Sequence, residues 1–193
     1  MLSESANRFA TGILYYGQDL CLTINSSVNA YRRLDPAYEA PNEIKMSATD
    51  RGSMIRIPIG NEKSARIEVR TVAPDANPYI AYYTLVKCGL AGMEASDTEF
   101  KKMEEAVFGH GAAANTNSTH KPEKLPAEIE TAITNFEKSA FMKKILGAEN
   151  HEKFASLKRN VAARSPRALG SKIKNGEILF HHEVYNQMIW TEF

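Results

Sequence analysis

Hydrophobic and polar residues alternate in two neighbouring stretches, 53–59 and 65–71. The apolar positions of the two stretches are Ile55, Ile57 and Ile59 in the first and Ala65, Ile67 and Val69 in the second. The positions between them are Met54, Arg56 and Pro58 in the first and Arg66, Glu68 and Arg70 in the second. A period of two is that of a half-buried β-strand. The polar run 60–64 begins with glycine, so we predict an antiparallel hairpin with a five-residue loop.

The loop length sets the expected pairing between the two strands. The predicted partners are Ile59 with Ala65, Ile57 with Ile67, Ile55 with Val69 and Arg56 with Glu68. Arg66 and Arg70 then lie two residues to either side of Glu68, which predicts three guanidinium groups around one carboxylate. Guanidinium forks suit phosphate and carboxylate oxygens, and the carboxylate can hold a divalent cation. The alternative interpretation is a solvated outer face of the sheet with one cross-strand ion pair.

Helical periodicity surrounds the hairpin. Ser3 or Ser5 can cap a first helix that ends near Gly17, and a mostly irregular segment is expected after it, before a short strand at 43–47. Asp75 to Pro78 signals the start of a helix that runs to about Met93. Its predicted core positions are Tyr79, Tyr83, Val86, Leu90 and Met93. Helices at 128–136 and 140–146 and a third with Phe154, Leu157 and Val161 follow the polar run 109–124, whereas the basic run 158–174 is expected to be solvated.

Composition narrows the function classes. The chain has 193 residues with 24 basic and 23 acidic side chains, a net charge of +1, so no general positive field would hold nucleic acid and any anion site must be local. Cys21 and Cys88 make neither a disulfide framework nor a metal cage, and reduced thiols are expected. No leader-like start and no apolar run near ~20 residues occurs, so we expect a cytoplasmic protein with no membrane partner.

Three runs of sequence resemble glutamine synthetase, in that family's order and spacing. They are NAYRRLDPAYEAP, SATDRGSMIRIP and ARIEVRTVAPDANPYIAYYTLVKCGLAGM. The resemblance is to the C-terminal half of the catalytic domain, with a core match over residues 3–93, a polar insert at about 109–124 and a helical tail over 125–193. It implies an α+β fold in which an antiparallel sheet packs against helices, so that residues 1–193 form part of one catalytic domain.

The resemblance also implies roles for individual residues. Arg33 and Arg70 match arginines that hold the substrate glutamate, and Glu39 matches the flap glutamate that takes a proton from ammonium. Arg51 matches the arginine over the transferring phosphoryl group and, with Arg56 and Arg66, those on the phosphates of ATP. Glu68 matches a ligand of the divalent cation, Mg²⁺ or Mn²⁺. The implied reaction is the ATP-dependent formation of glutamine from glutamate and ammonium through γ-glutamyl phosphate.

The chain departs from the family in what it lacks. The family's N-terminal domain and its other metal ligands have no counterpart here, and Asp50 and Gly52 stand where the family often has asparagine and serine. We therefore expect the isolated chain to be inactive and to need a complementing N-terminal half or a homo-oligomer. Two alternatives stay open: a relative that joins glutamate to amines or polyamines, and a non-catalytic binding or assembly module that keeps an anion patch.

Overall fold

The computed structural model describes residues 2–34, 40–109 and 121–164. The elements in these ranges are the helices α1 (Glu4–Tyr15), α2 (Gly17–Ile24), α3 (Val28–Arg33), α4 (Pro78–Glu94), α5 (Asp97–Phe108), α6 (Ile129–Lys138), α7 (Ala140–Leu146) and α8 (Ala148–Ala163), the strands β1 (Glu43–Ser47), β2 (Ser53–Arg56) and β3 (Glu68–Val69), and the 3-10 turn η2 (Glu62–Ser64). None of the described helices is long and apolar enough to cross a bilayer.

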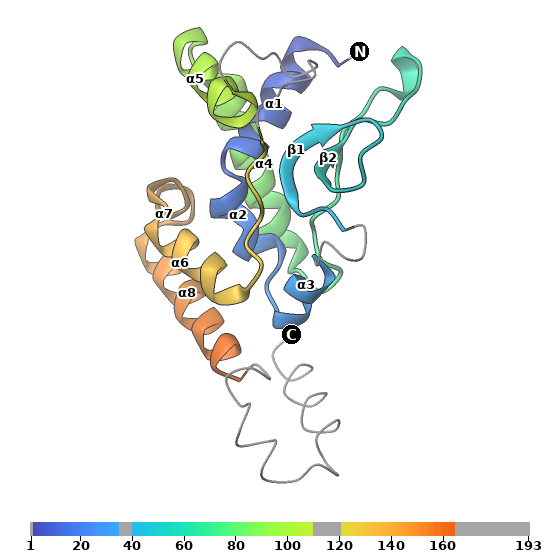
Figure 1. The fold of residues 1–193 in the computed structure, drawn as a ribbon. Helices are drawn as coiled ribbons and strands as arrows, with labels where there is room; N and C mark the ends of the chain where they lie inside the picture. The colour runs from blue at the N-terminus through green and yellow to red at the C-terminus, as the bar shows by residue number, and fades with distance from the viewer. Residues whose placement is uncertain (1, 35–39, 110–120, 165–193) are drawn as a thin grey trace, which may run out of the picture.

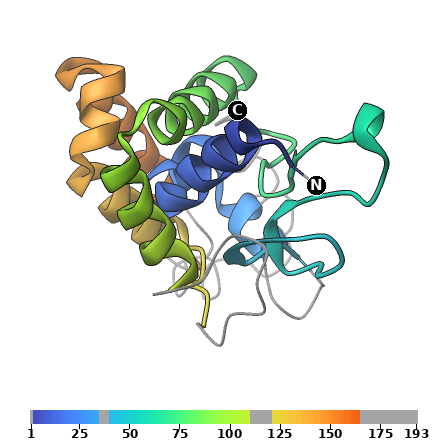
Figure 2. The same cartoon turned by 90° about the horizontal axis from the view of Figure 1, so that it is seen from above.

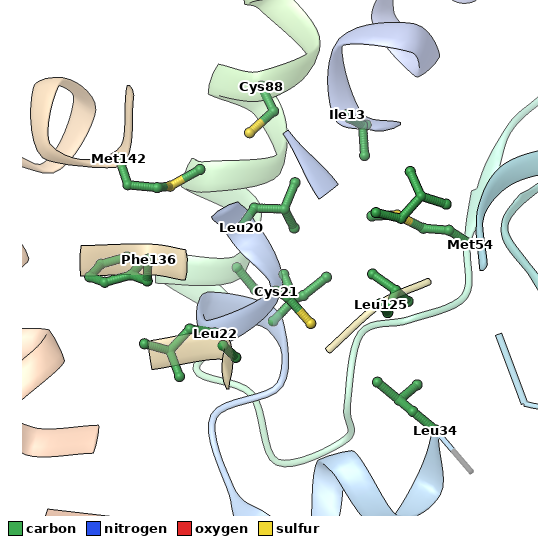
Figure 3. Packing of buried hydrophobic residues seen from close by; sticks show 14 of the residues in the cluster. Ile13, Leu20, Cys21, Leu22, Leu34, Met54, Cys88, Leu125, Phe136 and Met142 are labelled. Atoms are coloured by element: carbon green, nitrogen blue, oxygen red, sulfur yellow. The ribbon is translucent and has the colours of Figure 1, made fainter. Parts of the chain in front are cut away.

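The helices α1, α2 and α4 lie between a small sheet on one side and the helices α6, α7 and α8 on the other (Figure 1). The view from above keeps this order (Figure 2). One continuous apolar core joins the layers, with Leu20 and Cys21 of α2 at its centre, Phe136 on the α6 side and Met54 on the sheet side (Figure 3). The sheet is therefore attached to the helices through Met54 and Ile55 of β2 and through Ile44 of β1.

Capping residues define several helix starts as the sequence predicts. The Ser3 hydroxyl accepts a hydrogen bond from the Ala6 N–H at the start of α1, which confirms Ser3 as the cap. Asn77 caps α4 with Pro78 in the first helical position. Gly147, at φ +80°, separates α7 from α8, a backbone conformation that glycine adopts without strain.

The expected register of the hairpin is confirmed where the strands pair, because Ile55 pairs with Val69 and Arg56 with Glu68. The strands are much shorter than predicted, however, and β1 pairs with β2 in parallel, so the sheet is mixed rather than antiparallel. Ile59 is 83% exposed. The connection between β2 and β3 projects from the body (Figure 1), so the isoleucine side of the longer predicted strand is buried only in part: Ile67 packs against the edge of the core, whereas Ile59 does not.

Two predictions about helices are wrong. The segment after α1 is largely helical, because α2 and α3 occupy it. The predicted core face of α4 is mostly exposed, with Tyr79 at 85% and Val86 at 44%, and the helix instead buries Gly89 and Gly92 among other small residues. Two further differences concern α8, where Leu157 is 50% exposed and Lys158, expected in solvent, is buried.

Glycines allow α1 and α4 to approach each other closely. A Cβ atom on Gly12 would lie 2.4 Å from the Cys88 carbonyl oxygen, and one on Gly92 would lie 2.2 Å from the Arg8 carbonyl oxygen. Both obstacles are backbone atoms and cannot rotate away. The α1/α4 contact therefore requires glycine at both positions, which explains why α4 turns its small residues inward and its tyrosines outward.

Candidate functional site

Arg33 is held on the backbone of the segment that follows β3. It lies in the last turn of α3, and its Nη2 donates to the Thr71 carbonyl at 2.6 Å while Nη1 donates to the Arg70 carbonyl at 3.4 Å. These bonds join parts of the chain nearly forty residues apart. Arg33 and Arg70, the two arginines predicted to hold glutamate, are therefore brought together.

Arg70 connects that pair to the hairpin. Its backbone N–H donates to the Met54 carbonyl at 2.9 Å, which continues the pairing of β2 with β3 by one residue. Its guanidinium donates to the Arg51 carbonyl at 2.5 Å and lies 3.9 Å from the Glu68 carboxylate. Glu68 in turn accepts from Arg56 at 3.4 Å. We call Arg33, Arg51, Arg56, Glu68 and Arg70 the arginine cluster, because these contacts form one unbroken series.

Two predicted site residues are not placed in this cluster. The Arg66 guanidinium donates to the Ser64 carbonyl in the projecting connection, and no ion pair between Arg66 and Glu68 occurs within the described part of the chain. The residue falls before β3 rather than within it, so strand alternation does not apply to its side chain. Glu39 lies outside the described residues.

Burial and neighbouring charge act on the Arg33 guanidinium. Partial burial lowers its pKa from the ordinary value, the positive charge of Arg70 lowers it further, and the negative charge of Asp75 opposes both effects. The pKa of an arginine is so high that the side chain stays charged at neutral pH. The cluster therefore brings together the guanidinium groups of Arg33, Arg56 and Arg70 and one carboxylate, an excess of positive charge, while Arg51 joins it through its backbone carbonyl.

The described residues do not by themselves make a divalent-cation site. Glu68 is the one carboxylate of the cluster and already contacts two guanidinium groups, and no group of three or more metal-ligating side chains occurs within residues 2–34, 40–109 and 121–164. A divalent cation takes six or more oxygen ligands and is repelled by arginine. The described residues of the cluster therefore do not fit a divalent cation by themselves.

Sequence reasoning missed two residues that support Arg33. The Ser27 hydroxyl accepts from the Ala30 N–H and so caps α3, and it donates to the Asp75 carboxylate at 2.5 Å. A serine before a short helix is an N-cap signal that could have predicted α3. Asp75 follows β3 by six residues in a connection, and no local pattern indicates that it meets a residue nearly fifty positions earlier.

A groove of about 1010 Å³ lies away from the arginine cluster, between α2, the segment 123–127 and the helices α6 and α7. Its lining includes Asp19, whose pKa is raised by burial although the Ser139 hydroxyl donates to it at 2.8 Å. None of the predicted site residues in the described part of the chain lines this groove. The charged cluster, rather than this groove, is the candidate site.

Comparisons with known proteins match the part of the chain that contains these residues. The family model for the glutamine synthetase catalytic domain matches residues 1–170. Among curated proteins, the chain is 31% identical to a glutamine synthetase of Methanococcus maripaludis over 81% of this chain. It is 37% identical to one of Pyrococcus furiosus over 76% of this chain, and 33% identical to one of Staphylococcus aureus over 81%.

These matches cover 35%, 33% and 35% of the three relatives, respectively, so the chain spans about a third of the length of the curated proteins that it matches. The matched portion includes the whole arginine cluster, because the family model extends from residue 1 to residue 170. By its sequence, over most of its length, the chain belongs to the glutamine synthetase catalytic-domain family.

Proposed function

We propose that this chain supplies the substrate-holding and phosphate-holding arginines of a glutamine synthetase-type ligase, which forms glutamine from glutamate, ammonium and ATP. The observation that carries the proposal is the arginine cluster, in which two distant segments of chain meet through Arg33 and Arg70. Three guanidinium groups in a series of contacts with one carboxylate favour a ligand with several negative charges. Glutamate and the phosphates of ATP are such ligands.

The proposed reaction places separate demands on this surface. A carboxylate is a poor electrophile, so ATP first converts the glutamate side chain into γ-glutamyl phosphate, and positive groups offset the charge that gathers during phosphoryl transfer. Arg51 and Arg56 would act there, with Arg66 from the projecting connection. Arg33 and Arg70 would hold the glutamate substrate, and Glu39 would take the proton that makes ammonium nucleophilic. Glu68 would hold both Arg56 and Arg70 in place by bridging them.

A first test is nucleotide binding by the purified chain. ADP should shift the amide resonances of residues 51–70, with a dissociation constant on the order of 1 mM because the arginines are open to water and salt. Arg56→Ala should abolish these shifts, and rising salt should weaken them. The matched control is Arg159→Ala, which removes an arginine of α8 that pairs with Glu137 of α6. Shifts centred on residues 158–174 would indicate non-specific anion attraction and contradict the proposal.

A second test concerns turnover. The purified chain should form no glutamine, because the described residues complete no metal site and phosphoryl transfer in this family depends on divalent cations. A complementing N-terminal half, or the assembled oligomer, should restore activity. In that complex Glu39→Ala should impair amide formation more than formation of γ-glutamyl phosphate, and Arg51→Ala should impair the phosphoryl step. Turnover by the chain alone would overturn this part of the proposal.

A further inference from the structure

Asp75 contacts the N-terminal end of α3, the helix that carries Arg33 in its last turn. Its Oδ2 accepts the hydrogen bond from the Ser27 hydroxyl at 2.5 Å, and the same hydroxyl accepts from the Ala30 N–H at 3.2 Å. An N-cap hydroxyl has one proton to donate, so the acceptor that takes this proton fixes the rotation of the hydroxyl group. The carboxylate of Asp75 therefore sets the geometry of the cap on α3.

The other end of α3 carries the guanidinium that binds the backbone at Arg70 and Thr71. The helix has only six residues, Val28–Arg33, so the position of its cap directly affects the position of Arg33. Asp75 itself comes from the same connection as Arg70 and Thr71. Both ends of α3 are thus held by one segment, residues 70–75, through the Ser27 hydroxyl at one end and the Arg33 guanidinium at the other.

Two buried atoms of this group have complementary chemistry. Arg33 Nε and Asp75 Oδ1 each have no hydrogen-bond partner within the described residues. One is a donor on a cation and the other an acceptor on an anion, and a buried polar atom left unpaired is costly. The negative charge of Asp75 also favours the charged form of Arg33. A water molecule that accepts a hydrogen bond from Arg33 Nε and donates one to Asp75 Oδ1 would satisfy both atoms.

We propose that Asp75 is a positioning residue for Arg33, acting through the Ser27 cap of α3 and through its charge opposite the guanidinium. The inference rests on the proposed function for its consequence, since Arg33 is the residue that would hold glutamate. A carboxylate at Asp75 would restrict the orientation of the guanidinium fork and leave it ready to receive a substrate carboxylate. The nucleotide arginines Arg51 and Arg56 belong to the hairpin and are not held in this way.

The test uses the side-chain Nε–Hε resonance of Arg33 in the full chain, assigned by its loss in Arg33→Lys. Asp75→Asn keeps the shape of the side chain and removes its charge, so it should shift this resonance and speed its exchange with water by about tenfold. Glutamate binding should weaken at least fivefold, while the ADP shifts of residues 51–70 stay unchanged. The control Asp97→Asn removes a carboxylate that pairs with another arginine, Arg8, and should leave the Arg33 signal in place.

Two further variants separate the contribution of the Ser27 cap from that of the Asp75 charge. Ser27→Ala removes the cap hydrogen bond but keeps the carboxylate, so it should lower the melting temperature and change the Arg33 signal less than Asp75→Asn does. Asp75→Glu keeps the charge on a longer side chain and should bring the Arg33 signal part of the way back to its wild-type position. Ser27→Ala also serves as the test should Asp75→Asn fail to fold.

The outcomes are distinguishable. An Arg33 resonance with the wild-type position and exchange rate in Asp75→Asn, or in Ser27→Ala where the asparagine variant is unfolded, would overturn the positioning role, even with a lower melting temperature. Equal weakening of ADP and glutamate binding would also overturn it, because that pattern indicates a general structural defect. A displaced Arg33 signal in a chain that binds no glutamate would support the positioning role and contradict the proposed function of Arg33.

Discussion

The helical body and the hairpin hold their residues in different ways. The helical body consists of α1, α2, α4 and α6–α8, and its interior side chains, such as Leu20 and Phe136, are fully buried. The hairpin, residues 53–69, has strands of four and two residues and an exposed connection. Its arginines bind carbonyl oxygens and one carboxylate rather than packing in the core. The comparison indicates that most of the stability and the proposed anion binding belong to different regions, so substitutions should separate them.

The largest loss of stability is expected from the core between α6 and α8. The Phe136 ring is fully buried, stacks on His151 with ring centroids 4.5 Å apart and contacts Phe154. Phe136→Ala should lower the free energy of unfolding by about 3–5 kcal/mol in denaturant unfolding. Tyr82→Ala, which removes an aromatic ring that is 72% exposed, is the control. Comparable losses in both variants would contradict the assignment of stability to the helical body.

A smaller loss is expected where α1 meets α4. Gly92→Ala adds one methyl group that would lie 2.2 Å from the Arg8 carbonyl oxygen. The two helices must separate to admit it, and overpacking of this kind costs about 1–3 kcal/mol. Ser156→Ala on the exposed side of α8 serves as a control for a small change in a helix. An unchanged or higher melting temperature in Gly92→Ala would show that the helices adjust freely.

The isoleucine face of the hairpin should contribute less to the free energy of unfolding than the core between α6 and α8. Ile67 is half-buried against the edge of the core rather than within it. Ile67→Ala should therefore cost about 1 kcal/mol, below the 2–5 kcal/mol of a fully buried aliphatic side chain. Chemical denaturation of the two proteins measures the difference. A loss as large as that of Phe136→Ala would mean that the hairpin is as firmly anchored as the helices.

Sequence predicted the register of the hairpin but not the buried face of α4. A strand register depends on a period of two and on loop length, and both are local, so the pairing of Arg56 with Glu68 could be predicted. The predicted core face of α4 was wrong because its tyrosines dominate the apolar pattern, while its buried side consists of small residues that contribute little to that pattern. Which side faces inward depends on Gly12 of another helix. Sequence reasoning about one helix does not include that contact.

The candidate site shows the same division. Alternation alone predicts that Arg56, Glu68 and Arg70 share one surface, and the contacts of Glu68 with both arginines agree with it. The same alternation extends the strand too far, and Arg66 consequently lies outside the contacts that it predicts. The meeting of Arg33 with the Thr71 carbonyl depends on how α3 packs against the segment after β3, so no local pattern predicts it.

A further substitution should sharpen the comparison by removing binding without stability. The ion pair between Arg56 and Glu68 is about half exposed on both sides, and exposed pairs contribute between 0 and about 1 kcal/mol. Arg56→Ala should change the free energy of unfolding by less than about 0.5 kcal/mol while it abolishes the ADP response. Paired denaturation and NMR titrations measure both quantities. A loss of stability that accompanies the loss of binding would show that the same contacts of the hairpin serve both stability and anion binding.

The smallest expected effect is a dependence of stability on pH at the turn before β2. Asp50 pairs with Lys45 at 2.6 Å and accepts from the Gly52 N–H at 2.8 Å, and these interactions, Lys45 foremost, lower its pKa from the ordinary value of 3.8. A carboxylate whose pKa is lower in the folded state stabilises the fold fully above the unfolded-state pKa, and this stabilisation is lost as pH falls through the folded value.

Asp50→Asn keeps an acceptor for the Gly52 N–H but removes the charge that Lys45 attracts. At about pH 6 the variant should be less stable than the wild type by no more than about 0.5 kcal/mol, because the pair is partly exposed to water and salt. Thermal unfolding from about pH 6 to pH 2 should show the two proteins converge as the wild-type carboxylate takes up its proton. Glu152→Gln, at an exposed position of α8, controls for the general loss of one negative charge. If the difference persisted at about pH 2, it would have to come from the shape of the turn, and the ion pair would contribute nothing to holding Arg51 beside Arg70.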